Sequence, residues 1–228
     1  FWNITAFIKR KTPFPIEPEV LPKVDVVLIS HGHYDHLNTK SVRFLVKRFN
    51  PLFVAGTGFE GFFKKLGARV LTLGWQESFQ EGGINITALP VQHWSKRGFF
   101  DLNRTLWCGF LIRHSSRSYF WIGDTGYYDG FKEIGQRFGP VDVALVPIGA
   151  YEPRWFMKPF HCNPEEALLI ARDLNARLMI PIHWGTYDLT DEPLWMPVEA
   201  LKKAYDPQKD PPLKILEHGG HHITGEDS

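Results

Sequence analysis

Short apolar runs alternate with stretches of helical spacing along this chain. Residues 24–30 form a β-branched apolar run that predicts a buried strand, and residues 39–49 carry apolar side chains on one face of a predicted helix. Further apolar runs predict strands at residues 51–55, 84–91, 118–122, 141–148 and 178–182. We therefore expect an α/β fold with mixed sheets.

The segments between these runs carry boundary signals. Asn163 can cap a helix, Pro164 suits its first position and Glu166 can complete a capping box. Prolines make residues 1–20 an irregular lead-in, and the Gly-rich residues 219–228 are expected to form a flexible tail. No repeat or low-complexity linker interrupts the chain, which predicts one domain over residues 1–228.

Composition limits the function. A chain of 228 residues can bury a full core, and its formal net charge of +1 argues against a nucleic-acid partner. The cluster Lys9-Arg10-Lys11 either contacts a phosphate or an anionic lipid, or is a solvated loop. The two cysteines form no disulfide framework, and neither a membrane span nor a signal peptide is recognisable, so a cytoplasmic protein is expected.

The placement of the histidines points to chemistry. The run His31-Gly32-His33-Tyr34-Asp35-His36 directly follows the first predicted strand. Side chains two residues apart in an extended segment point the same way, so His31 and His33 project together. Packing offers no reason to gather four metal-binding side chains within six residues. The run therefore predicts metal ligands, with Asp35 and His36 serving a neighbouring ion.

Three further candidate ligands each follow a different predicted strand, and these are His93, Asp124 and His183. Each alone is more often structural, but loops at strand ends gather ligands in such sheets. We predict one site from His31, His33 and His93, and another from Asp35, His36 and His183, with Asp124 bridging. Imidazole and carboxylate donors suit two zinc ions, with iron or manganese as alternatives. Two such ions can share a hydroxide that attacks phosphorus or a carbonyl carbon.

These motifs resemble the metallo-β-lactamase superfamily, whose pattern is H-x-H-x-D-H, a distant His, an Asp within Gly-Asp-Thr and a last His. Within it the chain looks like N-acyl-phosphatidylethanolamine-hydrolysing phospholipase D and its bacterial relatives. That closer resemblance rests on the strings at residues 92–97, 123–127, 148–157 and 182–186. It implies an αββα sandwich, and since only thirty residues precede His31, part of the opening strands is expected to be missing from the numbered sequence.

The resemblance also implies the activity. We expect a metal-dependent phosphodiesterase that acts on a small-molecule or lipid phosphodiester. Peripheral contact with a membrane and assembly into a homodimer are left open. Asp35 and Asp124 are the candidate catalytic carboxylates, and His161, beside a capped helix, either contacts the phosphate and leaving group or anchors its loop. Tyr34, Tyr151 and Trp184 are the candidate substrate contacts, although Tyr34 also suits a packing role.

Other functions compete with this one. The same metal centre could serve a lactonase or an amide hydrolase, while a nuclease is disfavoured by the charge. A non-catalytic metal-binding protein is disfavoured because all seven candidate ligands are present. Residues 56–61 match G-x-G-x-x-G, but a turn between strand and helix explains the match as well as a dinucleotide site does. The remaining histidines near the C-terminus are not expected to be ligands.

Overall fold

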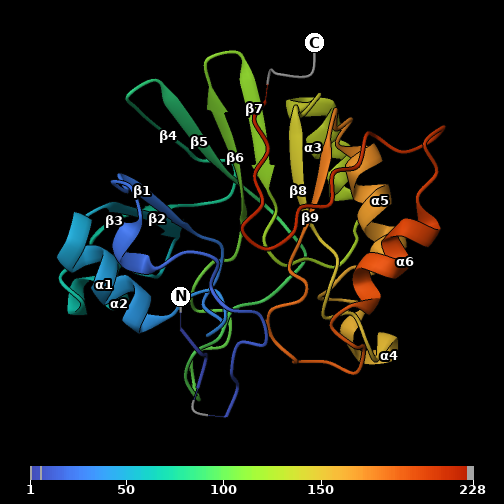
Figure 1. The fold of residues 1–228 in the computed structure, drawn as a ribbon. Coiled ribbons are helices and arrows are strands. Elements are labelled where there is room, and N and C mark those ends of the chain that lie inside the picture. Colours follow the sequence, from blue (N-terminus) through green and yellow to red (C-terminus); the bar gives the residue numbers. More distant parts are fainter. Residues whose placement is uncertain (1, 6, 225–228) are drawn as a thin grey trace.

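A computed structural model describes residues 2–5 and 7–224 as two packed sheets with helices outside them (Figure 1). The smaller sheet has the order β1-β2-β3 and is wholly parallel. Its elements along the chain are β1 (Val26–Ile29), α1 (Thr39–Phe49), β2 (Leu52–Gly56), α2 (Glu60–Lys65) and β3 (Arg69–Leu73). Apolar residues of α1 and α2, including Leu45 and Phe63, pack on Phe53 of β2 and cover the outer face of this sheet.

The larger sheet has six strands in sequence order, antiparallel from β4 to β7 and parallel from β7 to β9. The strands are β4 (Ser78–Glu81), β5 (Ile84–Leu89), β6 (Gly109–His114), β7 (Arg117–Trp121), β8 (Val143–Pro147) and β9 (Met179–Ile182). Its helices are α3 (Gly130–Phe138), α4 (Arg154–Met157), α5 (Pro164–Asp173) and α6 (Met196–Ala204). Phe131 of α3, Leu168 of α5 and Leu201 of α6 join the core formed with β7 and β8.

A third core closes the space between the sheets. Val54 and Leu73 of the smaller sheet pack with Ile86, Ala88 and Phe110 of the larger one. Each sheet is thus apolar on both faces, with one face against helices and one against the other sheet. This arrangement confirms the predicted α/β fold of the αββα type.

The described elements agree with the sequence pattern where that pattern was strongest. The helix predicted at residues 39–49 has those bounds, and Asn163 and Glu166 form the predicted capping box at the start of α5. Each predicted strand is present and differs by at most two residues at either end. No described helix is both long and apolar enough to cross a lipid bilayer.

The terminal segments lie against other parts of the chain. Among residues 2–5 and 7–25 the structure places a 3-10 turn at Pro18–Val20 and no strand, which agrees with the expected irregular lead-in. Of the predicted tail, residues 225–228 lie outside the described residues. Thr224 within the tail places its Oγ1 2.8 Å from the hydroxyl of Tyr119 on β7.

Candidate metal centre

The first motif lies between the end of β1 and the start of α1. Leu37 N donates to His33 O at 2.8 Å, which turns the chain so that His36 comes back toward His31. A Cβ at Gly32 would lie 2.8 Å from Ser95 Oγ, so glycine lets the motif pack against the loop after His93. The sequence thus places imidazoles from both ends of a short turn into one space.

The other three candidate ligands arrive from the larger sheet. His93 follows β5, where the neighbouring Gln92 N donates to Thr125 Oγ1 at 2.9 Å. Asp124 follows β7 and a glycine with a φ of +71°, where a Cβ would lie 2.8 Å from Ser30 Cβ. His183 follows β9 and itself has a φ of +59°, a conformation that non-glycine residues seldom adopt. All three strands end at the same edge of the sandwich as β1.

His31, His33 and His93 form the first ligand group, whose donor nitrogens lie within 4.8 Å of one another. His33 Nδ1 is 2.9 Å from His31 Nε2 and 3.3 Å from His93 Nε2. Ligand nitrogens of one tetrahedral zinc ion are separated by about 3.4 Å, given Zn–N bonds of about 2.0–2.1 Å. The spacing of this group fits a single small metal ion.

Asp35, His36, Asp124 and His183 form the second ligand group, within the same 4.8 Å limit. His36 Nε2 lies 3.3 Å from His183 Nε2 and 3.2 Å from Asp35 Oδ2. The two carboxylates and two imidazoles supply four donors to one point. Such a donor set suits zinc, iron or manganese.

Asp124 lies between the two groups. Its Oδ2 is 3.0 Å from His36 Nε2 in the second group, and 3.7 and 3.9 Å from His31 Nε2 and His93 Nε2 in the first. Its Oδ1 is 3.2 Å from His183 Nε2 and makes no hydrogen bond, although it is buried. A buried carboxylate oxygen with no hydrogen bond is costly, and a metal ion would satisfy it.

Burial and charge set the protonation of the two groups differently. Burial lowers the pKa of His31 well below its ordinary value, lowers that of His33, and lowers that of His93 to about 3. Although burial also acts on His36, the carboxylates of Asp124 and Asp35 raise its pKa well above the ordinary value. The first group is therefore held as neutral imidazoles, the form that binds metal.

The carboxylates of the second group stay ionised. Burial alone would raise the pKa of Asp124, but the facing His183 and His36 hold it well below its usual range. Burial alone would also raise the pKa of Asp35, but His36, as the main partner, holds it well below its usual range. Negative charge is thus concentrated where the second group would hold a cation.

Hydrogen bonds outside the two groups orient the imidazoles of the first. His31 Nδ1 is 3.0 Å from Ser30 Oγ, and His93 Nδ1 is 2.9 Å from Phe160 O. Both contacts turn the Nε2 atoms inward. Metal-binding histidines usually use their second ring nitrogen in this way. The geometry brings all seven predicted ligands together and fits two ions.

His161 lies at the same centre, as the sequence suggested. Its ring, together with His93 and Asp124, forms a third set of donors within 4.8 Å, and burial lowers its pKa to about 4. His161 Nδ1 is buried and has no hydrogen-bond partner among the described residues. The loop itself is held through the backbone, since His161 N donates to Met157 O at 2.9 Å and Arg154 donates to His161 O at 2.8 Å. The side chain is therefore not needed to anchor the loop.

The three predicted substrate contacts have different positions. The Tyr34 hydroxyl donates to Arg97 O at 2.8 Å, and the Arg97 guanidinium lies over the ring, which supports the packing role and not the predicted substrate contact. Tyr151 is buried, and its backbone N donates to Glu192 Oε1 at 3.1 Å, so it lines neither cavity at the metal centre. Trp184 does line a cavity there.

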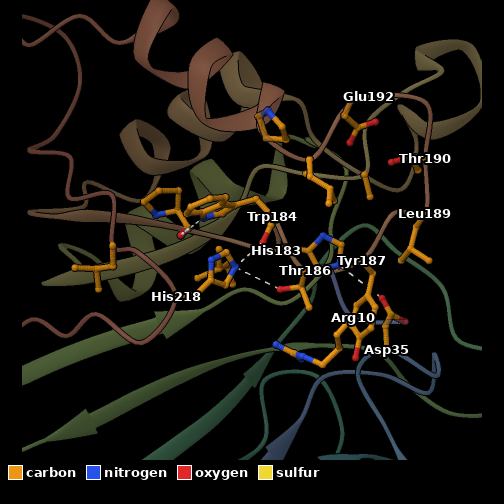
Figure 2. A pocket seen from close by; sticks show the side chains of 18 of the residues that line it. Arg10, Asp35, His183, Trp184, Thr186, Tyr187, Leu189, Thr190, Glu192 and His218 are labelled. Carbon is orange, nitrogen blue, oxygen red and sulfur yellow. Dashed lines mark hydrogen bonds and ion pairs between the residues drawn. The ribbon is translucent and has the colours of Figure 1, made fainter. Parts of the chain in front are cut away.

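Two cavities open beside the metal centre. A cavity of about 250 Å³ reaches Asp124, His161 and His183, and its other walls include Trp94, Phe156, Phe160 and Leu189. A second cavity of about 470 Å³ also includes His183 and is lined by the loop after β9, by Arg10 and by residues 216–218 (Figure 2). Of the aromatic residues nearby, Trp94 and Phe156 line the smaller cavity, whereas Trp155 is exposed.

The sequence did not predict that residues near both ends of the chain, Arg10 and His218, line this second cavity. Arg10 lines it, and the next residue, Lys11, donates its backbone N to Thr186 O at 2.8 Å. His218 is no member of either ligand group, but its Nε2 lies 3.2 Å from Trp184 O (Figure 2). The only signal for Arg10 was the basic cluster at residues 9–11, and no local pattern marked His218.

The G-x-G-x-x-G match has a structural explanation. A Cβ at Gly56 would lie 2.5 Å from Leu106 O, and one at Gly58, with a φ of +95°, would lie 2.5 Å from Arg104 O. Leu106 N in turn donates to Thr57 O at 2.8 Å. These glycines admit the neighbouring loop, so no nucleotide is needed to account for them.

Comparison with known proteins agrees with this geometry. The family model described as "Beta-lactamase superfamily domain" matches residues 1–184. An N-acyl-phosphatidylethanolamine-hydrolyzing phospholipase D of Caenorhabditis elegans is 41% identical over 91% of this chain and 63% of its own length. The mitochondrial protein of that name from Saccharomyces cerevisiae is 40% identical over 85% of this chain and 43% of its own length. The matched part of the chain thus spans 63% and 43% of the length of these two relatives.

The fold also resembles a solved structure. A metallo hydrolase of the archaeon Ignicoccus hospitalis superposes with a TM-score of 0.67, covering 88% of this chain and 79% of its own. The sequence identity is 21%, so this likeness concerns the fold alone.

Proposed function

Because the chain belongs to the beta-lactamase superfamily and has the centre of a metal-dependent hydrolase, we propose that it is a phosphodiesterase of phospholipase D type. The observation that carries the proposal is the convergence of seven imidazole and carboxylate side chains beside a cavity with mainly apolar walls. The names of the two similar relatives supply the substrate class, which is an N-acyl-phosphatidylethanolamine-like lipid.

Two zinc ions are the proposed cofactors, with iron or manganese accepted by the same donors. His31, His33 and His93 would hold one ion, and Asp35, His36 and His183 the other, with Asp124 shared. Bound ions of this kind lower the pKa of water and stabilise negative charge on a phosphoryl oxygen. The chain itself supplies the enclosure, because His31, His93 and Asp124 are all buried.

The proposed reaction is a hydrolysis. The oxygen of water bonds to phosphorus, the P–O bond to the N-acylethanolamine breaks, and the departing oxygen takes up a proton. We assign His161 a hydrogen bond to the phosphoryl or departing oxygen, because its ring lines the smaller cavity and its Nδ1 has no partner in the described chain. Trp94, Phe156 and Phe160 would contact the hydrocarbon part of the substrate.

A carbonyl substrate is the second candidate, and one observation favours it. No lysine or arginine is among the described residues that line the smaller cavity. Arg97 is directed away, since its guanidinium donates to Gly32 O and Leu37 O, and Arg154 pairs with Glu166 at 2.7 Å. Without a cationic side chain there, a neutral lactone or amide would be accommodated as readily as a phosphodiester.

Product analysis separates the two candidates. Metal-loaded protein is incubated with vesicles that contain N-acyl-phosphatidylethanolamine, and the products are identified by mass spectrometry beside a chelator-treated control. Release of N-acylethanolamine and phosphatidic acid, abolished by the chelator, is the expected result. If protein that carries about two metal ions releases neither product but opens simple lactones, the phospholipase assignment is wrong and the hydrolase centre is retained.

A further inference from the structure

Arg97 lies in the loop after His93 and contacts the ligand turn, by which we mean residues 32–37 between β1 and α1. Its guanidinium Nη1 donates to Gly32 O at 2.7 Å and to Leu37 O, also at 2.7 Å. These two carbonyls are at opposite ends of the turn, so one side-chain atom joins both ends. Hydrogen bonds from an ionised donor are stronger than those between neutral groups. Arg97 therefore constrains a turn that carries three of the candidate ligands.

The Arg97 guanidinium also lies against two aromatic rings. It is 4.4 Å from the ring centroid of Tyr34 and 5.0 Å from that of Phe62. The Tyr34 hydroxyl in turn donates to Arg97 O at 2.8 Å, so the turn and the loop hold each other through both side chains. Arg97 forms no ion pair with a carboxylate of a described residue. Carbonyl oxygens and ring faces thus stabilise this cation.

The backbone of the same loop lies close to the turn. Gly32 N donates to Ser95 Oγ at 3.0 Å, and Ser95 is buried. A Cβ at Gly32 would lie 3.2 Å from Arg97 Cγ, so glycine permits the close approach of the two segments. Asp101 accepts hydrogen bonds from Arg97 N at 3.1 Å and from Gly98 N at 2.7 Å. The loop is therefore ordered on its own and presents Arg97 to the turn in a defined position.

The charge of Arg97 is unfavourable for a residue beside a metal centre. A positive charge repels a metal cation, by an amount that depends on distance and on the surrounding dielectric. The charge acts within the ligand turn, because burial is the main cause that lowers the pKa of His33 and the charge of Arg97 adds to that lowering. Charge alone would therefore make Arg97 weaken metal binding. The two hydrogen bonds to the turn supply the opposite effect, since they order the ligands.

We propose that Arg97 is a positioning residue of the metal centre, which holds the ligand turn in the conformation that divides its three ligands between two ions. His33 belongs to the first ligand group, whereas Asp35 and His36 belong to the second. The inference deepens the proposed function, because it rests on the metal centre proposed there. Arg97 is not among the described residues that line the two cavities, so it acts through the ligands and not through the substrate.

The test measures metal affinity by competition with a chromophoric chelator in the unaltered protein, Arg97→Met and Arg97→Lys. Methionine keeps an unbranched side chain but has no charge and donates no hydrogen bond. Loss of the charge alone would raise the affinity, whereas loss of the positioning lowers it, so the sign of the change decides. We expect a fall of about tenfold in Arg97→Met, the effect of removing a partner that orients a metal ligand. Lysine can donate to the same carbonyls, so Arg97→Lys should restore part of the affinity although its charge still repels the ions.

Hydrogen exchange in the metal-free protein provides a second measurement. Leu37 N donates to His33 O at 2.8 Å within the turn, and this amide should exchange about tenfold faster in Arg97→Met. The matched control is Arg113→Met. The Arg113 guanidinium also donates to a backbone carbonyl, Phe138 O at 2.9 Å, but at the end of β6 away from the metal centre. The control should change neither the metal affinity nor the exchange of the turn.

Thermal melting shows which variants are folded. If Arg97→Met does not fold, Tyr34→Phe replaces it, because this variant removes the hydrogen bond to Arg97 O and keeps the ring. It should show a smaller loss of affinity than the tenfold expected for Arg97→Met. An affinity that is unchanged or raised in the folded variant would overturn the proposal and leave the proposed function intact.

The proposed function fails separately. Unaltered protein that binds two ions but hydrolyses no phosphodiester would lose the phospholipase assignment, while a fall of affinity in Arg97→Met would still support the positioning role. Absence of metal binding in the unaltered protein would overturn both.

Discussion

The two ligand groups of the metal centre are built from different chemistry. The first consists of three imidazoles, which burial holds neutral. The second combines two imidazoles with two carboxylates, and although burial lowers the pKa of His36, the carboxylates of Asp124 and Asp35 raise it well above its ordinary value. The positive charge of a metal ion in the first group would be balanced mainly by the carboxylate of Asp124. A metal ion in the second group would lie beside two carboxylates. Among the described ligands, Asp124 is the carboxylate whose oxygens approach imidazoles of both groups.

The two groups also differ in what positions them. His31 and His93 of the first group are oriented by hydrogen bonds from outside it, to Ser30 Oγ and Phe160 O. His183 of the second group is set by its backbone, which has a φ of +59° and packs against Gly149. Outer hydrogen bonds thus orient two imidazoles of the first group, whereas main-chain conformation orients His183 of the second. Each difference leads to a measurable consequence.

The largest effect is expected from Asp124→Ala, which removes the carboxylate that both groups approach. Even residues that only support a metal ligand change affinity or activity by about 10–100-fold, so losing the shared ligand should lower turnover on the order of a thousandfold or more. Metal analysis by mass spectrometry should show less metal in both groups. Asp129→Ala removes an exposed carboxylate that pairs with Lys132 and is the control. Full metal content in Asp124→Ala would contradict the bridging position.

A smaller and selective effect is expected from the single variants His33→Ala and His183→Ala. Each removes a donor from one group, so each protein should retain about one metal ion and lose about a hundredfold in turnover. Spectroscopy of cobalt-substituted protein distinguishes the groups, because the remaining ion has imidazole donors in one variant and mixed donors in the other. If both variants lose both ions, the two groups do not bind metal independently of each other, which would contradict the prediction.

The seven candidate ligands were unequally visible in the sequence. Four of the seven candidates, from His31 to His36, lie within six residues, and their spacing alone indicated a metal site. His93, Asp124 and His183 could be assigned only through the strands that precede them and through the resemblance. The period of apolar residues predicted those strands, and the common direction of β5, β7 and β9 in the larger sheet brings their ends together. Local pattern, sheet topology and the family resemblance together therefore predicted the ligands.

The walls around the ligands could not be predicted in the same way. Tyr34 lies inside the motif, yet its hydroxyl donates to the backbone of Arg97, more than sixty residues away, and it lines neither cavity at the metal centre. Arg10 and His218 reach the larger cavity because both terminal segments pack on the loop after His183. Such contacts depend on the packing of irregular segments, which leave no periodic pattern in the sequence. Residues that directly follow a predicted strand could be predicted, whereas residues brought in by long-range packing of irregular segments could not.

A backbone variant should disturb the second group more than the first. In Gly149→Ala the new Cβ would lie 2.2 Å from His183 O, so the loop that carries His183 must move. We expect the free energy of unfolding to fall by about 2 kcal/mol or more, and the second ion to be lost before the first. Gly61→Ala is the control, since a Cβ there meets nothing within 4 Å and alanine should stabilise helix α2 by up to about 1 kcal/mol. Equal stability of the two variants in chemical denaturation would show that the loop adapts freely.

The smallest effect is expected from Ser30→Ala. This variant tests whether a side-chain hydrogen bond orients the His31 imidazole of the first group. The variant removes the hydroxyl that lies 3.0 Å from His31 Nδ1 but keeps the backbone hydrogen bond from Cys108 N to Ser30 O. The imidazole loses its outer partner while the strand stays in place, so metal affinity of the first group should fall by about tenfold with little change in melting temperature. Competition with a chelator measures the affinity, and Ser78→Ala on the edge strand β4 is the control. An unchanged affinity would mean that packing alone orients His31, and that both groups are positioned by the backbone.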